Sequence, residues 1–344
     1  MQTHEEPIAH PRIPVIAGPT AGGKTALAVA VAKAFDKAGA GLGEVISADA
    51  FQVFQGMDIG TGKVTAEEMQ GVPHHLIDIL EPDDSEPFTV ARWLELAQQA
   101  VAEIRTRARV PIVAGGTHLY IKAFMEGMFE GPGADETIRQ KYRKMEPVAR
   151  RRLLERVDPQ AAQRIHPNDE RRTIRALEVF EITGTPISTH QAQWGCTRRA
   201  DARLIVLDWP TEAINSRINA RVKAMAAKGL VEEVESLLMQ GKLGEQAIQA
   251  LGYKQLGSVL REAFGCDGSE DEAVRGVRLP RLSEKALARA LEQTKIETRR
   301  FAKNQRTWLK RLSRAPDTVV LFPLESNLEE MTQVVVRACF GEEV

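Results

Sequence analysis

The fold is decided by the stretch AGPTAGGKTALAV, residues 17–29, which follows a short apolar run and contains the pattern G-x-x-x-x-G-K-T from Gly18 to Thr25. In this pattern, called a P-loop, successive backbone N–H groups point at a phosphate, Lys24 adds a point charge, and the Thr25 hydroxyl is placed to hold Mg²⁺. The stretch therefore predicts a phosphate or diphosphate site with Mg²⁺ as cofactor. It leaves open whether the phosphates belong to ATP or to a diphosphate that is only a leaving group.

Short β-rich runs alternate with helical patterns along most of the chain. Runs dominated by Val, Ile and Leu are expected strands at 13–18, 44–48, 75–80, 110–116, 203–209 and 318–322. Helical patterns are expected at 24–38, 88–107 and about 283–312. Continuous apolar strands are typical of a parallel sheet that is buried on both faces. We therefore expect an α/β fold with a P-loop NTPase-like parallel sheet.

The region 130–202 interrupts this alternation with helical segments. Helices are expected at 136–145, 148–157 and 169–184, with DPQ and HPND as start signals and Gly184 as a stop signal. We expect a helical insertion domain at 130–202 and a catalytic core made of 1–129 and 203–344. The stretch 265–282 has no clear period and is interpreted as a loop.

The charged residues are segregated along the chain. Of the 344 residues, 43% are apolar and 27% charged, which is ordinary for a globular protein. Lys and Arg outnumber Asp and Glu by 12 to 6 in 136–175 and by 11 to 3 in 281–314, whereas 50–90 has 1 basic residue against 8 acidic ones. Taken alone, each basic segment is equally well explained as the solvent-exposed face of a helix. Two of them in a chain of net charge −1 favour a surface that binds a polyanion.

Nothing in the sequence indicates export or a membrane partner. The apolar stretch ALAVAVAKAF is interrupted by Lys33 and is far shorter than the roughly 20 residues of a membrane-spanning helix. Cys196, Cys266 and Cys339 lie far apart and have no metal-type spacing, so we expect reduced thiols. Together these features predict a cytoplasmic protein.

Two aspartates could complete an ATP site next to the P-loop. Asp78 in LIDI and Asp208 in IVLDW both follow apolar runs, as the magnesium-binding aspartate of a phosphoryl-transfer enzyme does. Aspartate is also a common first residue of a turn. A small-molecule P-loop kinase therefore stays open at this point.

Further motifs follow the P-loop in a fixed order. They are ISADAFQVFQGMDIGTGK (46–63), VPHHLIDILEPDDS (72–85), AGGTHLYIKAFMEG (114–127), RIHPNDERRTIRALEVFEITG (164–184), INARVKAMAAKGLVEEVESLL (218–238), QAIQALGYKQL (246–256) and TRRFAKNQRTWLKR (298–311). With them the chain resembles the tRNA dimethylallyltransferases, also called tRNA isopentenyltransferases, over nearly its whole length. The resemblance implies that a dimethylallyl group is transferred from dimethylallyl diphosphate to N6 of the adenosine 3′-adjacent to the anticodon in tRNA. Diphosphate is released and no ATP is consumed.

The resemblance also implies the residues of a reaction site. A diphosphate site is implied at Gly18, Thr20, Ala21, Gly22, Gly23, Lys24 and Thr25, with Thr25 as the metal ligand. Catalytic residues are implied at Asp49, Thr117 and Arg221. Asp49 also fits the chemistry, because an adenine amine is a weak nucleophile that must lose a proton as it attacks. An aspartate at the end of the second strand lies in the ligand crevice of a parallel sheet.

The implied partner is the anticodon stem-loop of tRNA, bound by a monomer with no obligate protein partner. The implied tRNA contacts are Asp49, Ala50, Phe51, Gln52, Thr117, Arg139, Arg171, Arg172, Arg175, Gly252, Tyr253 and Lys254. The target base is stacked in a loop and must be extruded before it reaches a catalytic group. The basic segments 136–175 and 281–314 are expected to contact phosphates.

Small departures from the family pattern remove no implied catalytic group. Gly22-Gly23 stands where the family usually has Ser-Gly, Gly62 where it commonly has Ala, and Phe54 where Tyr is common. A prenyltransferase that acts on free adenine nucleotides would share the P-loop and the aspartate. It has less need of the insertion and of the basic C-terminal helix.

Overall fold

The computed structural model describes residues 10–128, 131–192, 198–263 and 282–342. The chain divides into two compact units, one formed by Met1–Lys122 and Ala200–Val344 and the other by Ala123–Arg199. The sequence predicts an insertion at 130–202, and the second unit spans most of that range. Cys196, Cys266 and nearly all of the predicted loop at 265–282 lie outside the described residues.

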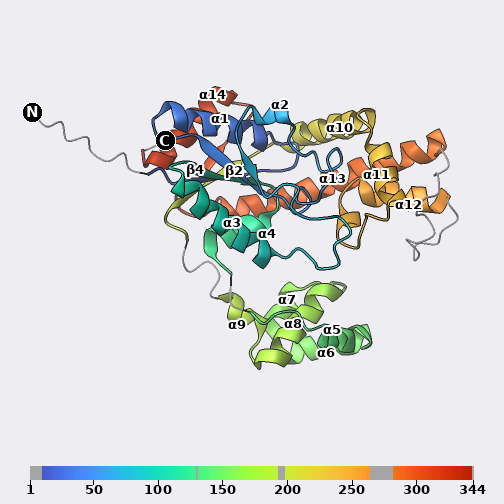
Figure 1. Ribbon diagram of the computed structural model, residues 1–344. Helices are drawn as coiled ribbons and strands as arrows, with labels where there is room; N and C mark the ends of the chain where they lie inside the picture. Colours follow the sequence, from blue (N-terminus) through green and yellow to red (C-terminus); the bar gives the residue numbers. More distant parts are fainter. Residues whose placement is uncertain (1–9, 129–130, 193–197, 264–281, 343–344) are drawn as a thin grey trace, which may run out of the picture. The chain divides into compact units, whose positions relative to one another are not determined.

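The first unit is built on a six-stranded parallel sheet in the order β3-β2-β4-β1-β5-β6 (Figure 1). The strands are β1 (Ile13–Ala17), β2 (Gly43–Ala48), β3 (His74–His75), β4 (Val110–Gly115), β5 (Ala202–Leu207) and β6 (Val319–Leu321). Every residue of β1, β2 and β4 is buried, as expected for strands that are covered on both faces. The predicted α/β class with a parallel sheet is confirmed.

The strand expected at 75–80 is wrong for most of its length. Only His74–His75 pairs with β2, and the chain then leaves the extended conformation. Leu76 and Asp78 have φ angles of 60° and 55°, in the left-handed region that interrupts a strand. The backbone instead bonds to the segment after β2, where Ile79 N donates to Val53 O at 2.8 Å.

Helices cover both faces of the sheet. Helix α1 (Lys24–Lys37) packs with α14 (Leu328–Phe340) on one face, where Phe35 and Phe340 meet edge to face at 6.0 Å, and α3 (Val90–Thr106) lies on the other face (Figure 1). Helix α4 (His118–Glu126) begins just after β4, and the short α2 (Ala66–Met69) has a capping box between Thr65 and Glu68. Both helices predicted next to the sheet, at 24–38 and 88–107, are confirmed.

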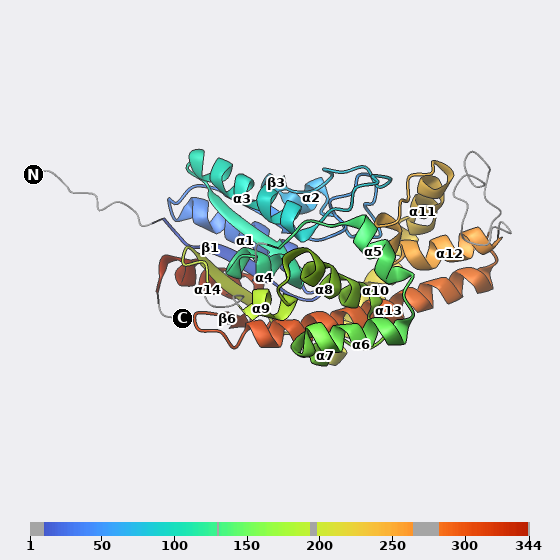
Figure 2. The ribbon, with the colours of Figure 1, turned by 90° about the horizontal axis from the view of Figure 1, so that it is seen from below.

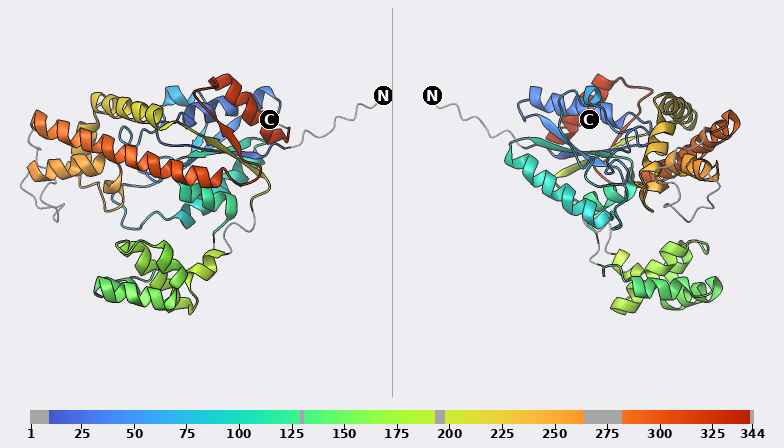
Figure 3. Two further views of the ribbon diagram at one scale, coloured as in Figure 1. Left: turned by 180° about the vertical axis from the view of Figure 1, so that it is seen from behind. Right: turned by 45° about the vertical axis from the view of Figure 1, so that its right-hand side comes forward.

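A group of helices extends from the sheet in the second half of the chain. It contains α10 (Thr211–Ala227), α11 (Leu230–Met239), the 3₁₀ turn η1 (Ala247–Gln249), α12 (Tyr253–Ala263) and α13 (Glu284–Leu312). Helix α13 lies beside α10 (Figure 2) and runs as one unbroken rod, drawn in orange (Figure 3). A buried stripe at helical spacing runs along it, from Ala290 through Thr294, Thr298, Ala302, Gln305 and Leu309 to Leu312. The long helix expected at 283–312 is confirmed.

The second unit is helical. It consists of α5 (Glu136–Arg143), α6 (Pro147–Val157), α7 (Pro159–Arg164), α8 (Glu170–Thr183) and α9 (Ile187–Ala192). The start signals act as caps, since Asp158 accepts from Ala161 N and Asp169 accepts from Arg172 N. Gly184 ends α8 with a φ of 68°. Leu154, Ile174 and Leu177 belong to a separate apolar core in this unit.

Within the described ranges, no helix is both long and apolar enough to cross a membrane.

Cys339 is a buried free thiol on α14, and burial raises its pKa to about 12.

Candidate active site

The carboxyl ends of three central strands lie side by side. In the sheet, Gly115 at the end of β4 stands opposite Ala17 of β1 and Ala48 of β2. The segments that follow these strands, the P-loop, the turn after β4 and the segment that begins with Asp49, therefore start at the same edge. In an open parallel sheet, ligands bind at this edge, where neighbouring connections diverge.

The predicted diphosphate residues lie in the turn between β1 and α1 and in the first two positions of α1. They are Gly18, Thr20, Ala21, Gly22, Gly23, Lys24 and Thr25. Ala21 and Gly23 have φ angles of 60° and 85°, and Gly23 is the N-cap of α1. The first N–H groups of a helix have no partner within the helix and attract an anion. Lys24 Nζ donates to Pro19 O at 2.8 Å, so its ammonium is held beside the turn.

Contacts from the segment after β5 and from α10 hold the P-loop in place. Trp209 Nε1 donates to Gly22 O at 3.1 Å, and Arg217 Nε donates to Ala21 O at 2.7 Å. A Cβ on Gly22 would stand 2.8 Å from Pro19 O, so the backbone is closely packed at this point of the turn.

Gln305 of α13 also holds the P-loop, a role that was not predicted from the sequence. Its Oε1 accepts from Thr20 N at 2.9 Å, and its Nε2 donates to Gly116 O at 2.8 Å. It is 2% exposed. Gln305 thus bridges the P-loop and the turn after β4. A glutamine within the buried stripe of an amphipathic helix was the available signal, because a buried amide needs hydrogen-bond partners.

Asp49 and Thr117 lie at adjoining strand ends, and Thr117 bonds to the segment that carries Asp49. Asp49 Oδ1 accepts from Phe51 N at 2.9 Å, which forms a turn directly after β2. Thr117 Oγ1 accepts from Ala50 N at 3.1 Å, and Thr117 N donates to Ala48 O at 3.1 Å. Two of the three predicted catalytic residues therefore belong to one hydrogen-bonded pair of turns.

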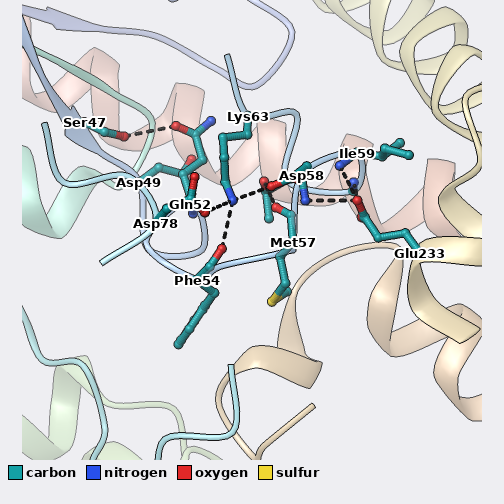
Figure 4. A network of polar contacts seen from close by, with 12 residues as sticks. Ser47, Asp49, Gln52, Phe54, Met57, Asp58, Ile59, Lys63, Asp78 and Glu233 are labelled. Carbon is teal, nitrogen blue, oxygen red and sulfur yellow. Dashed lines mark hydrogen bonds and ion pairs between the residues drawn. The ribbon is translucent and has the colours of Figure 1, made fainter. Parts of the chain in front are cut away.

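Polar contacts continue from Asp49 into the next loop (Figure 4). Ser47 Oγ donates to Gln52 Oε1 at 3.0 Å, and Gln52 Nε2 donates to Gly62 O at 3.4 Å. Lys63 Nζ donates to Phe54 O at 2.9 Å and pairs with Asp58 at 2.6 Å and with Asp78. Asp78 therefore neutralises a lysine.

Two cavities adjoin at Asp49. The smaller has a volume of about 90 Å³ and is lined by Lys24, Thr25, Ser47, Asp49 and Arg221 among others. Asp49 is the one carboxylate among the described residues that line it. Neither Asp78 nor Asp208 lines it, so the aspartates that could have completed an ATP site lie elsewhere.

The larger cavity has a volume of about 450 Å³ and a more apolar wall. Its apolar lining includes Phe51, Ile218, Val222, Met225, Leu230, Leu251 and Phe301. Thr20, Asp49, Thr61, Arg221 and Phe301 line both cavities. The arrangement suits a ligand with a charged end and an apolar end, together with a second molecule beside it.

Two cations lie within electrostatic reach of Asp49. Burial lowers the pKa of Lys24 to about 8; the Asp49 carboxylate raises it and the Arg221 charge lowers it. Burial also lowers the pKa of Arg221, and the Asp49 charge opposes this shift. Arg221 Nη2 donates to Thr61 O at 3.2 Å. The structure thus brings together all three predicted catalytic residues and the P-loop lysine.

The predicted tRNA contacts of the second unit differ in their surroundings. Arg139 and Arg175 both bond to Glu178, at 2.9 Å and 2.6 Å, and Glu178 is fully buried. These two arginines thus have a structural role inside the unit. Arg171 and Arg172 are exposed near the start of α8, and Arg172 lies 3.4 Å from Asp169.

The predicted tRNA contacts Gly252, Tyr253 and Lys254 also differ in their exposure to solvent. Tyr253 is 0% exposed, and its hydroxyl donates to Glu233. Burial, followed by the Glu233 charge, raises its pKa. The Tyr253 side chain is therefore part of the protein interior rather than of an RNA-binding surface. Lys254 is exposed, and Gly252 has a φ of 95° at the start of α12.

A basic groove lies between α10 and α13. It has a volume of about 510 Å³, and its cationic lining residues are Arg299, Arg300, Lys303, Arg306 and Lys310. Arg306 donates to Thr211 Oγ1 at 2.6 Å, whereas Arg300 pairs with Glu297 at 2.7 Å. Such a row of cations fits a sugar-phosphate backbone.

The sequence of the chain is similar to those of several known proteins. A family model described as IPP transferase matches residues 52–312. A tRNA dimethylallyltransferase 1 from Trichlorobacter lovleyi is 42% identical over 306 residues, which covers 87% of this chain and 91% of that protein. A tRNA dimethylallyltransferase from a Thermoanaerobacter species is 39% identical over 345 residues, which covers 96% of this chain and 98% of the relative.

Solved structures agree with these matches. The crystal structure of a tRNA isopentenylpyrophosphate transferase from Staphylococcus epidermidis is similar with a TM-score of 0.63 and 34% identity, over 94% of this chain and 97% of that one. A eukaryotic dimethylallyltransferase acting on tRNA has a TM-score of 0.72 and 26% identity, over 91% of this chain and 75% of that one.

Proposed function

The chain belongs to the IPP transferase family, and on this basis we infer that it transfers a dimethylallyl group from dimethylallyl diphosphate to tRNA. The acceptor is N6 of the adenosine 3′-adjacent to the anticodon. The observation that supports this reaction most directly is the pair of adjoining cavities with Asp49 and Arg221 in both linings.

The smaller cavity suits the diphosphate of the donor. The P-loop amides, Lys24 and Arg221 would face the charge that accumulates on the leaving group. Mg²⁺ fits the donor set, because it binds phosphate oxygens and water together with one or two protein oxygens. Thr25 would hold it, and Ser47 lines the same cavity. The metal would supply positive charge to the leaving diphosphate.

The larger cavity suits the dimethylallyl group and the extruded adenine, because its wall is mainly apolar and Asp49 stands at its polar end. The adenine N6 forms a bond to C1 of the dimethylallyl group while the bond from C1 to the diphosphate oxygen breaks. Asp49 takes the proton that N6 loses, and the electron pair of the broken bond leaves with diphosphate. Thr117 would hold the amine, since its hydroxyl lies in the wall beside Asp49.

The tRNA would be bound by groups beyond these cavities. Arg171, Arg172 and Lys254 are exposed cations, and the basic groove of α10 and α13 suits phosphates. We propose that the protein acts as a monomer. The cytoplasm stays the predicted location.

Acceptor labelling tests the proposal. The protein is incubated with Mg²⁺ and radiolabelled dimethylallyl diphosphate, and with an unmodified anticodon stem-loop, AMP or ATP in parallel. We expect label in the stem-loop alone, and its loss when the target adenosine is replaced by guanosine. Label in AMP or ATP at a comparable rate would contradict the tRNA assignment and favour a free-nucleotide prenyltransferase.

A further inference from the structure

The loop 57–63 borders the site and supplies contacts to two of its residues. Thr61 O accepts from Arg221 Nη2 at 3.2 Å, and Gly62 O accepts from Gln52 Nε2 at 3.4 Å. Thr61 also lines both cavities. The position of this loop therefore sets where the Arg221 guanidinium stands relative to the P-loop.

Glu233 of α11 holds the middle of this loop through backbone amides (Figure 4). Its Oε2 accepts from Asp58 N at 3.0 Å and from Ile59 N at 2.8 Å, and its Oε1 accepts from Gly60 N at 3.1 Å. The Tyr253 hydroxyl donates to the same Oε1. Four donors thus converge on one carboxylate, and three of them are consecutive backbone amides. Hydrogen bonds to an ionised acceptor are stronger than neutral ones.

The packing around Glu233 leaves the loop little freedom. A Cβ on Gly60 would stand 2.3 Å from a ring carbon of Tyr253, so the loop lies directly against that buried ring. Lys63 fixes the end of the loop through Phe54 O and Asp58. Glu233 and Lys63 therefore define the path of the intervening carbonyl groups.

The orientation of the Arg221 side chain depends on the path of this loop. Within the described part of the chain, the bond to Thr61 O is the one hydrogen bond that the protein gives its guanidinium. The remaining N–H groups of the fork stay available for a phosphate. A guanidinium with a single protein acceptor turns when that acceptor moves, so a small shift of Thr61 O would redirect all of its donors.

We propose that Glu233 is a positioning residue for the transfer reaction: by binding three consecutive amides of the loop 57–63, it fixes Thr61 O and so aims Arg221 at the donor diphosphate. Glu233 lines neither cavity, so it would act through Arg221. The inference rests on the proposed function for its catalytic consequence. Its effect on diphosphate binding does not depend on the identity of the acceptor.

The first test measures binding of inorganic diphosphate with Mg²⁺ by calorimetry, in the absence of RNA. In Glu233→Gln, an amide NH₂ group replaces one oxygen and faces backbone donors, so the loop should loosen. We expect affinity to fall about tenfold, as when one charge-assisted hydrogen bond is removed. Glu232→Gln removes a charge from the adjacent exposed position on the same helix and should bind as the parent protein does.

The second test separates positioning from general loosening. If Glu233 acts through Arg221, then Glu233→Gln should weaken diphosphate binding in the parent protein and have no further effect in an Arg221→Ala background. Independent, multiplicative losses would overturn the proposal, as would parent-like binding by Glu233→Gln. Tyr253→Phe keeps the ring and removes one donor, so it should give a smaller loss in the same direction and serves if Glu233→Gln unfolds.

The third test is single-turnover transfer to the stem-loop with saturating substrates. We expect Glu233→Gln to lose up to about 100-fold in rate, the scale of a small misplacement, with stem-loop affinity within threefold of the parent. A parent protein that binds diphosphate but labels no stem-loop would contradict the proposed function and leave the binding result valid. Unchanged transfer by Glu233→Gln would contradict the positioning role itself.

Discussion

The carbonyl oxygen of Ala48 occupies the space beside Gly115 that a side chain would need. A Cβ on Gly115 would stand 2.1 Å from that oxygen, and the two residues are partners in the β2–β4 register. The ends of these strands carry Asp49 and Thr117. Absence of a side chain at Gly115 thus allows the two turns to approach closely enough for their hydrogen bonds.

We therefore predict that Gly115→Ala impairs both folding and reaction. Overpacking between two backbones should cost about 1–3 kcal/mol of unfolding free energy. It should also part Thr117 from Ala50, so the single-turnover transfer rate should fall by more than tenfold. Chemical denaturation and rapid quench measure the two effects. Gly133→Ala is the matched control, because a Cβ there meets nothing within 4 Å. Equal behaviour of both variants would contradict the argument.

A second prediction concerns the pH dependence of donor use. Burial lowers the pKa of Lys24 to about 8, so the free protein loses this positive charge as the pH rises through that value. The donor is an anion, so its capture should weaken on the alkaline side. We expect kcat/KM for dimethylallyl diphosphate to fall above pH 8, because this ratio reports ionisations of the free enzyme.

Lys24→Arg tests this assignment. Arginine stays charged over the accessible pH range, so its slower reaction should lack the alkaline fall near pH 8. If the variant shows the same fall as the parent protein, another group is responsible.

The sequence predicts the sheet well because the signals for its strands are local. Continuous apolar runs gave β1, β2, β4, β5 and β6, and the capping residues Asp158 and Asp169 and the stop at Gly184 gave helix ends. The strand at 75–80 was wrong because Leu76 and Asp78 adopt a left-handed conformation. Neither residue type favours that conformation enough for a local pattern to reveal it.

The residues of the site can likewise be divided into those that a local motif predicts and those that it does not. The P-loop and Asp49 lie in contiguous motifs and were predicted from them. Gln305 and Glu233 were missed, since their partners lie 285 and 173–175 residues away in the chain. Such bonds depend on how helices pack, and a single sequence does not carry the distance between two helices.

The third prediction concerns the basic groove between α10 and α13. Lys303 and Lys310 line it, and we expect each to bind a tRNA phosphate. Replacing both by Ala should weaken stem-loop binding and reduce the log-salt slope by up to about one unit for each phosphate that is no longer neutralised. Fluorescence anisotropy over a range of salt concentrations measures the slope. Lys37→Ala, at the exposed end of α1, should leave it unchanged. A double variant with the parent slope would mean that the groove is only a solvated surface.

The last prediction concerns Asp49. Asparagine preserves the size of the side chain, and its Oδ1 still accepts from Phe51 N, the contact that forms the turn after β2. It cannot take a proton from the adenine amine. Removal of a general base costs about 10²- to 10⁴-fold in rate, so Asp49→Asn should slow single-turnover transfer by that amount with donor and stem-loop saturating. Asp83→Asn, an exposed aspartate outside both cavities, controls for the change of charge. Stem-loop affinity should fall far less than the rate, because Oδ1 still holds the turn after β2 and the phosphate contacts of the tRNA lie outside the two cavities. A rate for Asp49→Asn within threefold of the parent would show that the carboxylate does not take the proton. Either another group is then the base, or the bond between C1 and diphosphate breaks far enough before attack that no base is needed.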